Sequence, residues 1–237
     1  AIFLVNALIK NGLPKNMINV ITGDNGKRIF ESILSFPTID MVTFTGGLEA
    51  GIEIKKMMVK KSHFLTKYVP ELGGSSSLII CEDGNLDKAI QVILNGCFKN
   101  SGQRCTSIRR VIIDNKIAEK FIKKLVLEVK KIKYGDPYNE DNDMGTVIDE
   151  ISATNIENRV NQAITDGATL LHGNKRLGAI YSPTVLDNVN LSMELVKKET
   201  FGPVCPIIRS NSFQESLEIA KETKYRLAGG IITNDSN

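Results

Sequence analysis

The sequence predicts an α/β protein built on a doubly wound parallel sheet. Apolar runs with helical spacing alternate with short runs rich in Val and Ile. Glycine-containing turns repeatedly follow a strand-like run and precede a helical one, which is the element order of doubly wound sheets. Hydrophobic residues make up 42% of the 237 residues, enough for a substantial core.

The first part of the chain begins with a helix, predicted over 2–10. This helix ends at Asn11-Gly12 with Pro14 just beyond, a usual stop sequence. Residues 17–21 are apolar and predict a short buried strand. The same reasoning gives helices over 27–34 and 49–60, and strands over 40–44 and 64–69.

The alternation resumes at residue 78. The predicted strands cover 78–81, 111–113, 169–171, 204–208 and 229–233, and the predicted helices cover 86–98, 117–131, 151–165 and 213–221. Between the two halves lies Gly-Gly-Ser-Ser-Ser at 73–77, whose small residues indicate a flexible hinge. We therefore expect one domain over 1–73 and a second over 74–237.

Composition excludes several classes of function. The net charge of +3 gives no argument for a nucleic-acid partner, and no apolar run is long enough to span a membrane. The four cysteines contain no C-x-x-C pair, so we expect no metal site and a reducing, cytoplasmic location. The chain opens on an apolar helical pattern without an initiator Met, and we expect it to be an internal piece of a longer protein.

One of these cysteines, Cys105, ends the polar loop 100–106 between a helical run and a strand-like run. A thiol at such a junction is well placed to act as a nucleophile in its thiolate form. A buried, inert cysteine is the commoner explanation for a single thiol. The loop alone leaves both explanations open.

Three further motifs carry candidate chemistry. The turn at 44–47 combines two glycines with a helix start, which suits either a phosphate or an ordinary tight turn. Glu71 precedes the glycine pair at 73–74 and is either a general base or a surface carboxylate. The segment 199–203 joins an acid, an aromatic ring and a rigid turn, or is simply a helix end.

Together these motifs resemble those of the aldehyde dehydrogenase superfamily. Phe-Thr-Gly-Gly at 44–47 resembles its FTGS motif, and Glu-Leu-Gly-Gly at 71–74 matches ELGG. Gly-Gln-Arg-Cys at 102–105 matches G-Q-x-C, and the run at 199–204 matches E-x-F-G-P-V. Glu71 and Cys105 are 34 positions apart, as the family pattern leads one to expect. The resemblance covers nearly the whole chain, and the cysteine loop looks most like the lactaldehyde and non-phosphorylating glyceraldehyde-3-phosphate dehydrogenase branch.

This resemblance implies the second half of a Rossmann-like cofactor domain followed by most of an α/β catalytic domain that is incomplete at its C-terminus. It implies that Cys105 is the nucleophile and that Glu71 activates the water that releases the product. It implies NAD or NADP as cofactor, with nine residues that contact it: Gly23, Gly26, Phe44, Thr45, Gly46, Gly47, Leu72, Glu199 and Phe201. Gly47 departs from the family pattern, because a Ser usually stands there.

The implied reaction oxidises an aldehyde to a carboxylic acid through a cysteine thiohemiacetal and a thioester. The presence of Glu71 favours hydrolysis over transfer to coenzyme A, while a CoA-acylating enzyme and a non-catalytic fragment or binding module stay open as alternatives. We expect a small hydroxylated or phosphorylated aldehyde such as lactaldehyde as substrate, met by Arg104 and Thr106. Arg104 equally suits a contact with a structural carboxylate. The whole protein is expected to be a homo-oligomer, a dimer or tetramer, and the segment alone is expected to be inactive.

Overall fold

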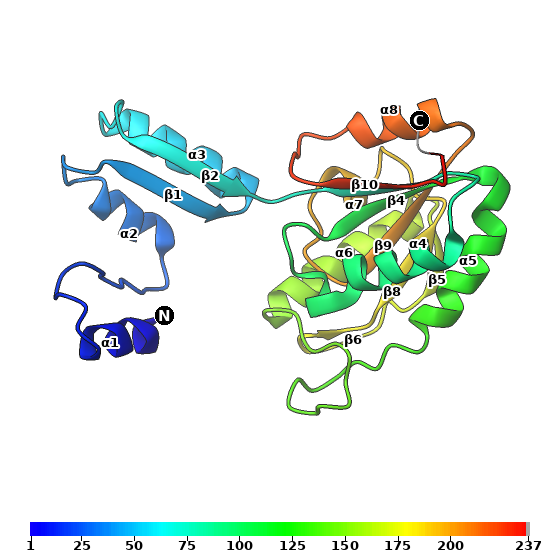
Figure 1. The fold of residues 1–237 in the computed structure, drawn as a ribbon, viewed down its shortest axis with the longest axis horizontal. Coiled ribbons are helices and arrows are strands. Elements are labelled where there is room, and N and C mark those ends of the chain that lie inside the picture. Colours follow the sequence, from blue (N-terminus) through cyan, green and yellow to red (C-terminus); the bar gives the residue numbers. More distant parts are fainter. Residues whose placement is uncertain (236–237) are drawn as a thin grey trace. The chain divides into compact units, whose positions relative to one another are not determined.

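The fold is that of a computed structural model that describes residues 1–235 (Figure 1). The chain divides into two compact units, Ala1–Leu72 and Gly73–Asn237, and each is considered by itself. The last two residues of the expected second domain, 236 and 237, lie outside the described residues. Both units alternate helices and strands, so the predicted α/β class is confirmed.

The first unit is a parallel pair of strands with three helices. Strands β1 (Met41–Gly46) and β2 (Lys67–Leu72) pair in register from Met41 opposite Lys67 to Gly46 opposite Leu72. Their crossover is α3 (Leu48–Lys60), preceded in the chain by α1 (Ile2–Lys10) and α2 (Gly26–Ile33). A small core holds the unit together, formed by the buried Leu34, Val42, Ile54 and Met58. The helix predicted over 2–10 is confirmed.

The strand predicted over 17–21 is wrong. This segment forms turns and irregular backbone, and its apolar side chains Met17, Ile18, Val20 and Ile21 are exposed. A strand needs a neighbour to accept and donate its backbone hydrogen bonds. No strand among residues 1–235 pairs with this segment. Its apolar composition alone is therefore not enough to form a strand.

The second unit is built on a six-stranded sheet in the order β10-β3-β4-β9-β8-β5. The first five strands of that order are parallel and β5 is antiparallel to β8. The strands are β3 (Ser76–Ile80), β4 (Ile108–Asp114), β5 (Thr169–His172), β8 (Thr184–Asp187), β9 (Val204–Ser210) and β10 (Gly229–Ile232). A separate short hairpin joins β6 (Arg176–Leu177) to β7 (Ile180–Tyr181).

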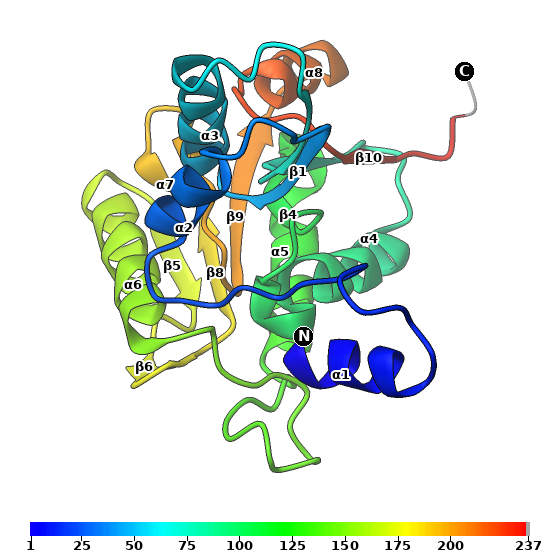
Figure 2. The ribbon, with the colours of Figure 1, turned by 90° about the vertical axis from the view of Figure 1, so that its left-hand side faces the viewer.

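Helices cover both faces of this sheet (Figure 2). In β4, Val111 and Ile113 belong to the core beneath α4 (Leu86–Ile93) and α5 (Asn115–Val129). Ile112 points the other way, into the core shared with α6 (Glu150–Thr165), α7 (Glu194–Lys197) and α8 (Phe213–Lys221). This alternation follows from the two-residue period of a strand. Each fully buried Ile contributes roughly 1.5–3 kcal/mol to stability.

Two local features differ from the sequence prediction near the cysteine loop. The helix predicted over 86–98 changes type, because α4 ends at Ile93 and a π-helical turn spans Leu94–Phe98. Such turns often mark functional sites. The hinge predicted over 73–77 is in part a strand, since Ser76 and Ser77 belong to β3 and are buried.

Candidate active site

The loop that presents Cys105 has a strained backbone. Asn100, Ser101 and Gly102 have consecutive positive φ angles of 57°, 54° and 68°. The hydroxyl of Ser101 donates to the Gly145 carbonyl at 3.0 Å, and the hydroxyl of Ser107 donates to the Gly102 carbonyl at 3.1 Å. Left-handed residues other than glycine are costly and persist where neighbours fix them. The loop is therefore held rigidly by its surroundings.

Gln103 anchors the same loop from its other side. Its side-chain oxygen accepts from the Ile148 N–H at 2.7 Å, and its side-chain nitrogen donates to the Thr146 carbonyl at 3.3 Å. Both partners belong to the segment that leads into α6. The glutamine of the G-Q-x-C motif thus ties the thiol loop to the neighbouring segment.

The thiol itself is accessible. Of the four cysteines, all within the described part of the chain, Cys105 is the exposed one. Cys97 and Cys205 are buried, and Cys97 donates through Sγ to the Ile108 carbonyl at 3.4 Å. Cys81 is half-buried, and burial raises the pKa of its thiol.

Arg104 contacts backbone rather than a carboxylate. Its guanidinium donates to the carbonyls of Asn95 and Gly96 in the π-helical turn. A π-helical turn leaves carbonyls without their usual helical partners, and Arg104 supplies the missing donors. No carboxylate forms an ion pair with Arg104 among residues 1–235, so the structural partner of this arginine differs from the one expected.

Glu199 reaches the glycine pair of the E-L-G-G motif. Its carboxylate accepts from the Gly74 N–H at 3.2 Å. A Cβ on Gly73 would occupy the space of that carboxylate, and a Cβ on Gly74 would lie 2.6 Å from the Cys105 carbonyl oxygen. The absence of side chains at these two glycines thus leaves room for the Glu199 carboxylate beside Gly73 and for the cysteine loop beside Gly74.

The charge of Glu199 is under opposing influences. Burial raises the pKa of this carboxyl, whereas the Gly74 N–H and the cations of Arg109 and Arg159 oppose the rise. Its backbone is also fixed, because the Glu199 N–H donates to the Tyr225 hydroxyl at 3.1 Å and Arg159 donates to the Glu199 carbonyl at 2.5 Å. Two residues along, the ring of Phe201 is 45% exposed and free to pack against a planar ligand.

In the first unit, the predicted base and the predicted phosphate turn lie at one edge of the strand pair. Thr45 is opposite Glu71 and Gly46 is opposite Leu72 in the parallel register. Both Thr45 and Glu71 are exposed. The carboxyl ends of parallel strands are where α/β proteins bind their ligands.

The turn that follows β1 leaves a helix N-terminus uncapped. Gly47 is the N-cap of α3 and offers no side chain to the first N–H groups of that helix. A Cβ on Gly47 would have no neighbour within 4 Å, whereas one on Gly46 would meet the ring of Phe44 at 2.5 Å. Free N–H groups with open space before them fit a phosphate.

An apolar cavity of about 490 Å³ opens between α2 and α3. Gly26 and Phe44 line it together with Ile29 and Ile54. A Cβ on Gly23 would lie 2.8 Å from the end of Ile29, so that glycine leaves room for a lining side chain. The cavity and the open helix start are contained in one unit, and their chemistry fits the adenosine and pyrophosphate of a dinucleotide.

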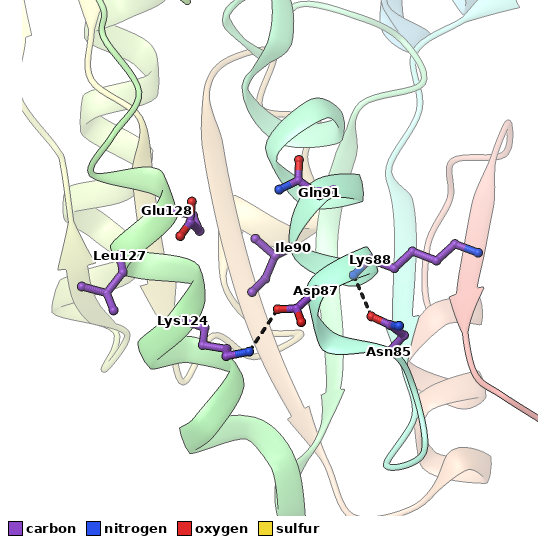
Figure 3. Close-up of a pocket in the computed structure, with 8 residues that line it drawn as sticks. All are labelled: Asn85, Asp87, Lys88, Ile90, Gln91, Lys124, Leu127 and Glu128. Carbon is purple, nitrogen blue, oxygen red and sulfur yellow. Dashed lines mark hydrogen bonds and ion pairs between the residues drawn. The ribbon is translucent and has the colours of Figure 1, made fainter.

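A groove with different chemistry lies in the second unit. Figure 3 shows this groove of about 770 Å³ between α4 and α5, lined by charged side chains such as Lys124 and Asp87, which pair at 3.0 Å. None of the predicted site residues lines it. Exposed ion pairs of this kind are usual on helix surfaces, and we assign the groove no role.

Within residues 1–235 no cluster of three His, Cys, Asp or Glu side chains is close enough to hold a metal ion. Over the same residues, every helix is too short or too polar to cross a membrane.

Comparison with known proteins decides the family. The profile of the aldehyde dehydrogenase family matches residues 1–237. The chain belongs to this family. Lactaldehyde dehydrogenase of Methanococcus aeolicus is 38% identical over 225 residues, which are 95% of this chain and 47% of that protein. The chain spans about half the length of the curated relatives it matches.

Solved aldehyde dehydrogenase structures share the fold. The NADP-dependent glyceraldehyde-3-phosphate dehydrogenase of Bacillus halodurans, complexed with NADP, has a TM-score of 0.93 and 38% identity, covering 99% of this chain and 48% of that one. Betaine aldehyde dehydrogenase of Staphylococcus aureus, in complex with NAD+, has a TM-score of 0.92 and 34% identity, covering 99% of this chain and 47% of that one.

One buried residue beside the cysteine loop is not among the residues predicted from the sequence. Arg109 lies in β4, is 3% exposed and contacts both the cysteine loop and the 199–203 segment. The sequence contains an indication of it, because two adjacent arginines interrupt the apolar run of this strand. A buried charge in a strand requires specific partners.

Proposed function

We propose that the whole protein to which this chain belongs is an NAD(P)-dependent aldehyde dehydrogenase that releases a carboxylic acid. The observation that carries the proposal is Cys105, the exposed thiol on a strained and firmly anchored loop. Family membership and the contact between Glu199 and Gly74 support it. An accessible thiol on a fixed loop is what nucleophilic catalysis requires.

In the proposed mechanism, the Cys105 thiolate attacks the aldehyde carbon and forms a thiohemiacetal. The backbone N–H of Cys105 and a side-chain amide stabilise the negative charge that develops on the substrate oxygen. The chemistry that a bound NAD or NADP supplies is acceptance of the hydride lost by the substrate carbon. Glu71 then removes a proton from water, and hydrolysis of the thioester frees the acid and regenerates the thiol.

The proposed cofactor residues are assigned to parts of the dinucleotide one unit at a time. The uncapped N-terminus of α3 with Thr45, Gly46 and Gly47 would hold the pyrophosphate, and the cavity beside Gly26 and Phe44 would hold the adenosine. Gly23 shapes the same cavity through Ile29. Glu199 is assigned to the nicotinamide ribose, and Phe201 and the Leu72 backbone to the nicotinamide ring.

We propose a small hydroxylated or phosphorylated aldehyde as the substrate. The names of similar proteins support this class, since they include lactaldehyde dehydrogenase and glyceraldehyde-3-phosphate dehydrogenase. Arg104 and Thr106 flank the nucleophile and are the candidates for contact with the substrate. Because Arg104 donates to two backbone carbonyls, its role at the substrate would require its remaining N–H groups.

The test is a substrate screen on the full-length protein with NAD and NADP side by side, using lactaldehyde, glyceraldehyde 3-phosphate and betaine aldehyde. We expect formation of reduced cofactor with at least one aldehyde. Cys105→Ser is expected to lower kcat by at least about 10³-fold, the range seen when a covalent nucleophile is removed. Cys81→Ser is the matched control and should retain activity. No oxidation of any aldehyde, or equal activity of the two variants, would overturn the proposal.

A further inference from the structure

Arg109 is a buried cation near the start of β4 in the six-stranded sheet. It lies where the register between β3 and β4 shifts, since Ile108 is opposite Ser76 and Arg110 is opposite Ser77. With only 3% of its surface exposed, its guanidinium has lost most of its contact with water. Such a group is stable only where protein atoms replace that hydration.

The replacement comes from two separate segments. On one side, Nη2 of Arg109 donates to the carbonyls of Gly102 at 2.5 Å and Arg104 at 3.2 Å, both in the cysteine loop. On the other side, Nη1 donates to the Gly202 carbonyl at 3.0 Å, 93 positions along the chain. One planar guanidinium therefore joins the loop of the proposed nucleophile to the segment of the proposed cofactor residues.

The same group also contacts an aromatic ring. The guanidinium carbon of Arg109 lies 5.5 Å from the centre of the Phe201 ring, within the distance of a cation–π interaction. Burial lowers the pKa of Arg109 to about 10, and the Glu199 carboxylate opposes this effect. The guanidinium remains charged at neutral pH, so its contacts persist under ordinary conditions.

We propose that Arg109 is a positioning residue that fixes the Cys105 loop relative to the Glu199 and Phe201 side chains. The proposal rests on the proposed function for the roles of those three residues. Arg109 acts through the carbonyls of Gly102, Arg104 and Gly202, to which its guanidinium donates, and not through the thiol itself. The planar guanidinium group suits this task, because its N–H donors have fixed directions and hold several carbonyls in a fixed mutual geometry.

The neighbouring residue provides a matched control. Arg110 is also buried, at 1% exposed, but its hydrogen-bond partners are different. Its guanidinium donates to the carbonyls of Ser75, Ile219 and Ala220, which tie α8 to the start of β3. Arg110→Lys therefore imposes the same chemical change on the same strand while leaving the Gly102 and Gly202 contacts intact.

The experiment compares Arg109→Lys and Arg110→Lys in the full-length protein. It measures thermal unfolding, kcat, the dissociation constant of NAD(P), and the rate of Cys105 alkylation by iodoacetamide. Lysine keeps the positive charge but replaces the planar guanidinium with a single ammonium group, so it cannot donate to all three carbonyls in the same geometry. We expect Arg109→Lys to lower kcat by about 10- to 100-fold, since small misplacements of reacting groups cost that much. It should also weaken cofactor binding and change the alkylation rate.

Arg110→Lys should lower the melting temperature without changing the other three quantities. If Arg109→Lys changes only the melting temperature, as its neighbour does, the positioning role is overturned. The alkylation rate separates this outcome from failure of the proposed function. A wild-type protein that oxidises no aldehyde contradicts the proposed function, whereas an alkylation rate altered by Arg109→Lys alone still supports positioning of the loop.

Discussion

The carboxylate of Glu199 accepts a hydrogen bond from the Gly74 backbone N–H at 3.2 Å, although the two residues are 125 positions apart. The contact depends on glycine, because a side chain at Gly73 would fill the space of the carboxylate. It brings together two motifs that the sequence shows only as distant fragments. It also buries part of a charged group, which has measurable consequences.

Glu199→Gln should stabilise the protein at neutral pH. Burial raises the pKa of Glu199 in the folded state, so the folded protein favours the protonated carboxyl. The stability linked to this protonation is fully present below the unfolded pKa of roughly 4.3 and is lost as pH rises through the raised folded value. Glutamine cannot ionise, so the variant should exceed wild type in melting temperature at pH 8 and approach it at pH 4.

The exposed Glu140 serves as the comparison, because its side chain makes no hydrogen bond with any other residue of 1–235. Glu140→Gln should give the same small difference at both pH values. A pH-independent effect of Glu199→Gln would show that burial of this carboxylate costs nothing.

Gly102→Ala should destabilise the protein far more than Gly178→Ala. Both glycines have positive φ, at 68° and 57°. The left-handed conformation of an alanine therefore lowers the free energy of unfolding by roughly 1–2 kcal/mol at each position. A Cβ on Gly102 would also collide with the Gly202 carbonyl, whereas one on Gly178 would meet nothing within 4 Å. We expect a further loss of about 1–3 kcal/mol at Gly102, measured by denaturant unfolding.

Equal losses for the two glycine variants would mean that the loop and the 199–203 segment separate at little cost. That result would also weaken the role given to Arg109, which joins the same two segments.

Gly47→Ser should strengthen cofactor binding modestly. Gly47 is the N-cap of α3 without a side-chain partner, and its missing Cβ has open space around it. A serine hydroxyl there can accept from the first N–H groups of the helix, stabilising it by a few tenths of a kcal/mol relative to glycine. The same hydroxyl can donate to a phosphate. Calorimetric titration with NAD and NADP would detect the expected few-fold tighter binding, and weaker binding would contradict this placement of the pyrophosphate.

Glu71→Gln should stop the reaction after the first half. Glutamine cannot accept the proton of water, so the thioester on Cys105 should accumulate. Rapid mixing would then show one equivalent of reduced cofactor followed by almost no turnover, and mass spectrometry would detect the acylated thiol. Continued turnover without coenzyme A would contradict the hydrolytic role. Steady turnover of the wild type only when coenzyme A is supplied would instead favour the acylating reaction.

Several parts of the fold follow directly from local sequence patterns. The helix over 2–10 is set by its apolar spacing and by the stop at Asn11-Gly12, and it matches α1. The strand–glycine–helix order around Gly46 likewise produced β1, the turn and α3. These patterns act over a few residues, so they can be recognised without knowing what packs against them.

Other features depend on partners that the local pattern does not reveal. Residues 17–21 have the apolar composition of a strand, but a strand forms only where a neighbour completes its hydrogen bonds. Arg104 was expected to contact a structural carboxylate or a substrate. Its guanidinium donates to the carbonyls of a π-helical turn that the helical spacing did not predict, and its contact with a substrate stays a proposal.

By itself, the sequence determined the α/β class, the identity of the motifs and the candidate residues Cys105, Glu71 and Glu199. Only the tertiary structure decided that Glu199 meets Gly74 and that Arg109, rather than Arg110, faces the cysteine loop. The reason is physical. Motifs and periodicity are properties of neighbouring residues, whereas a buried charge is satisfied by whichever carbonyls the packed sheet and loops bring to it.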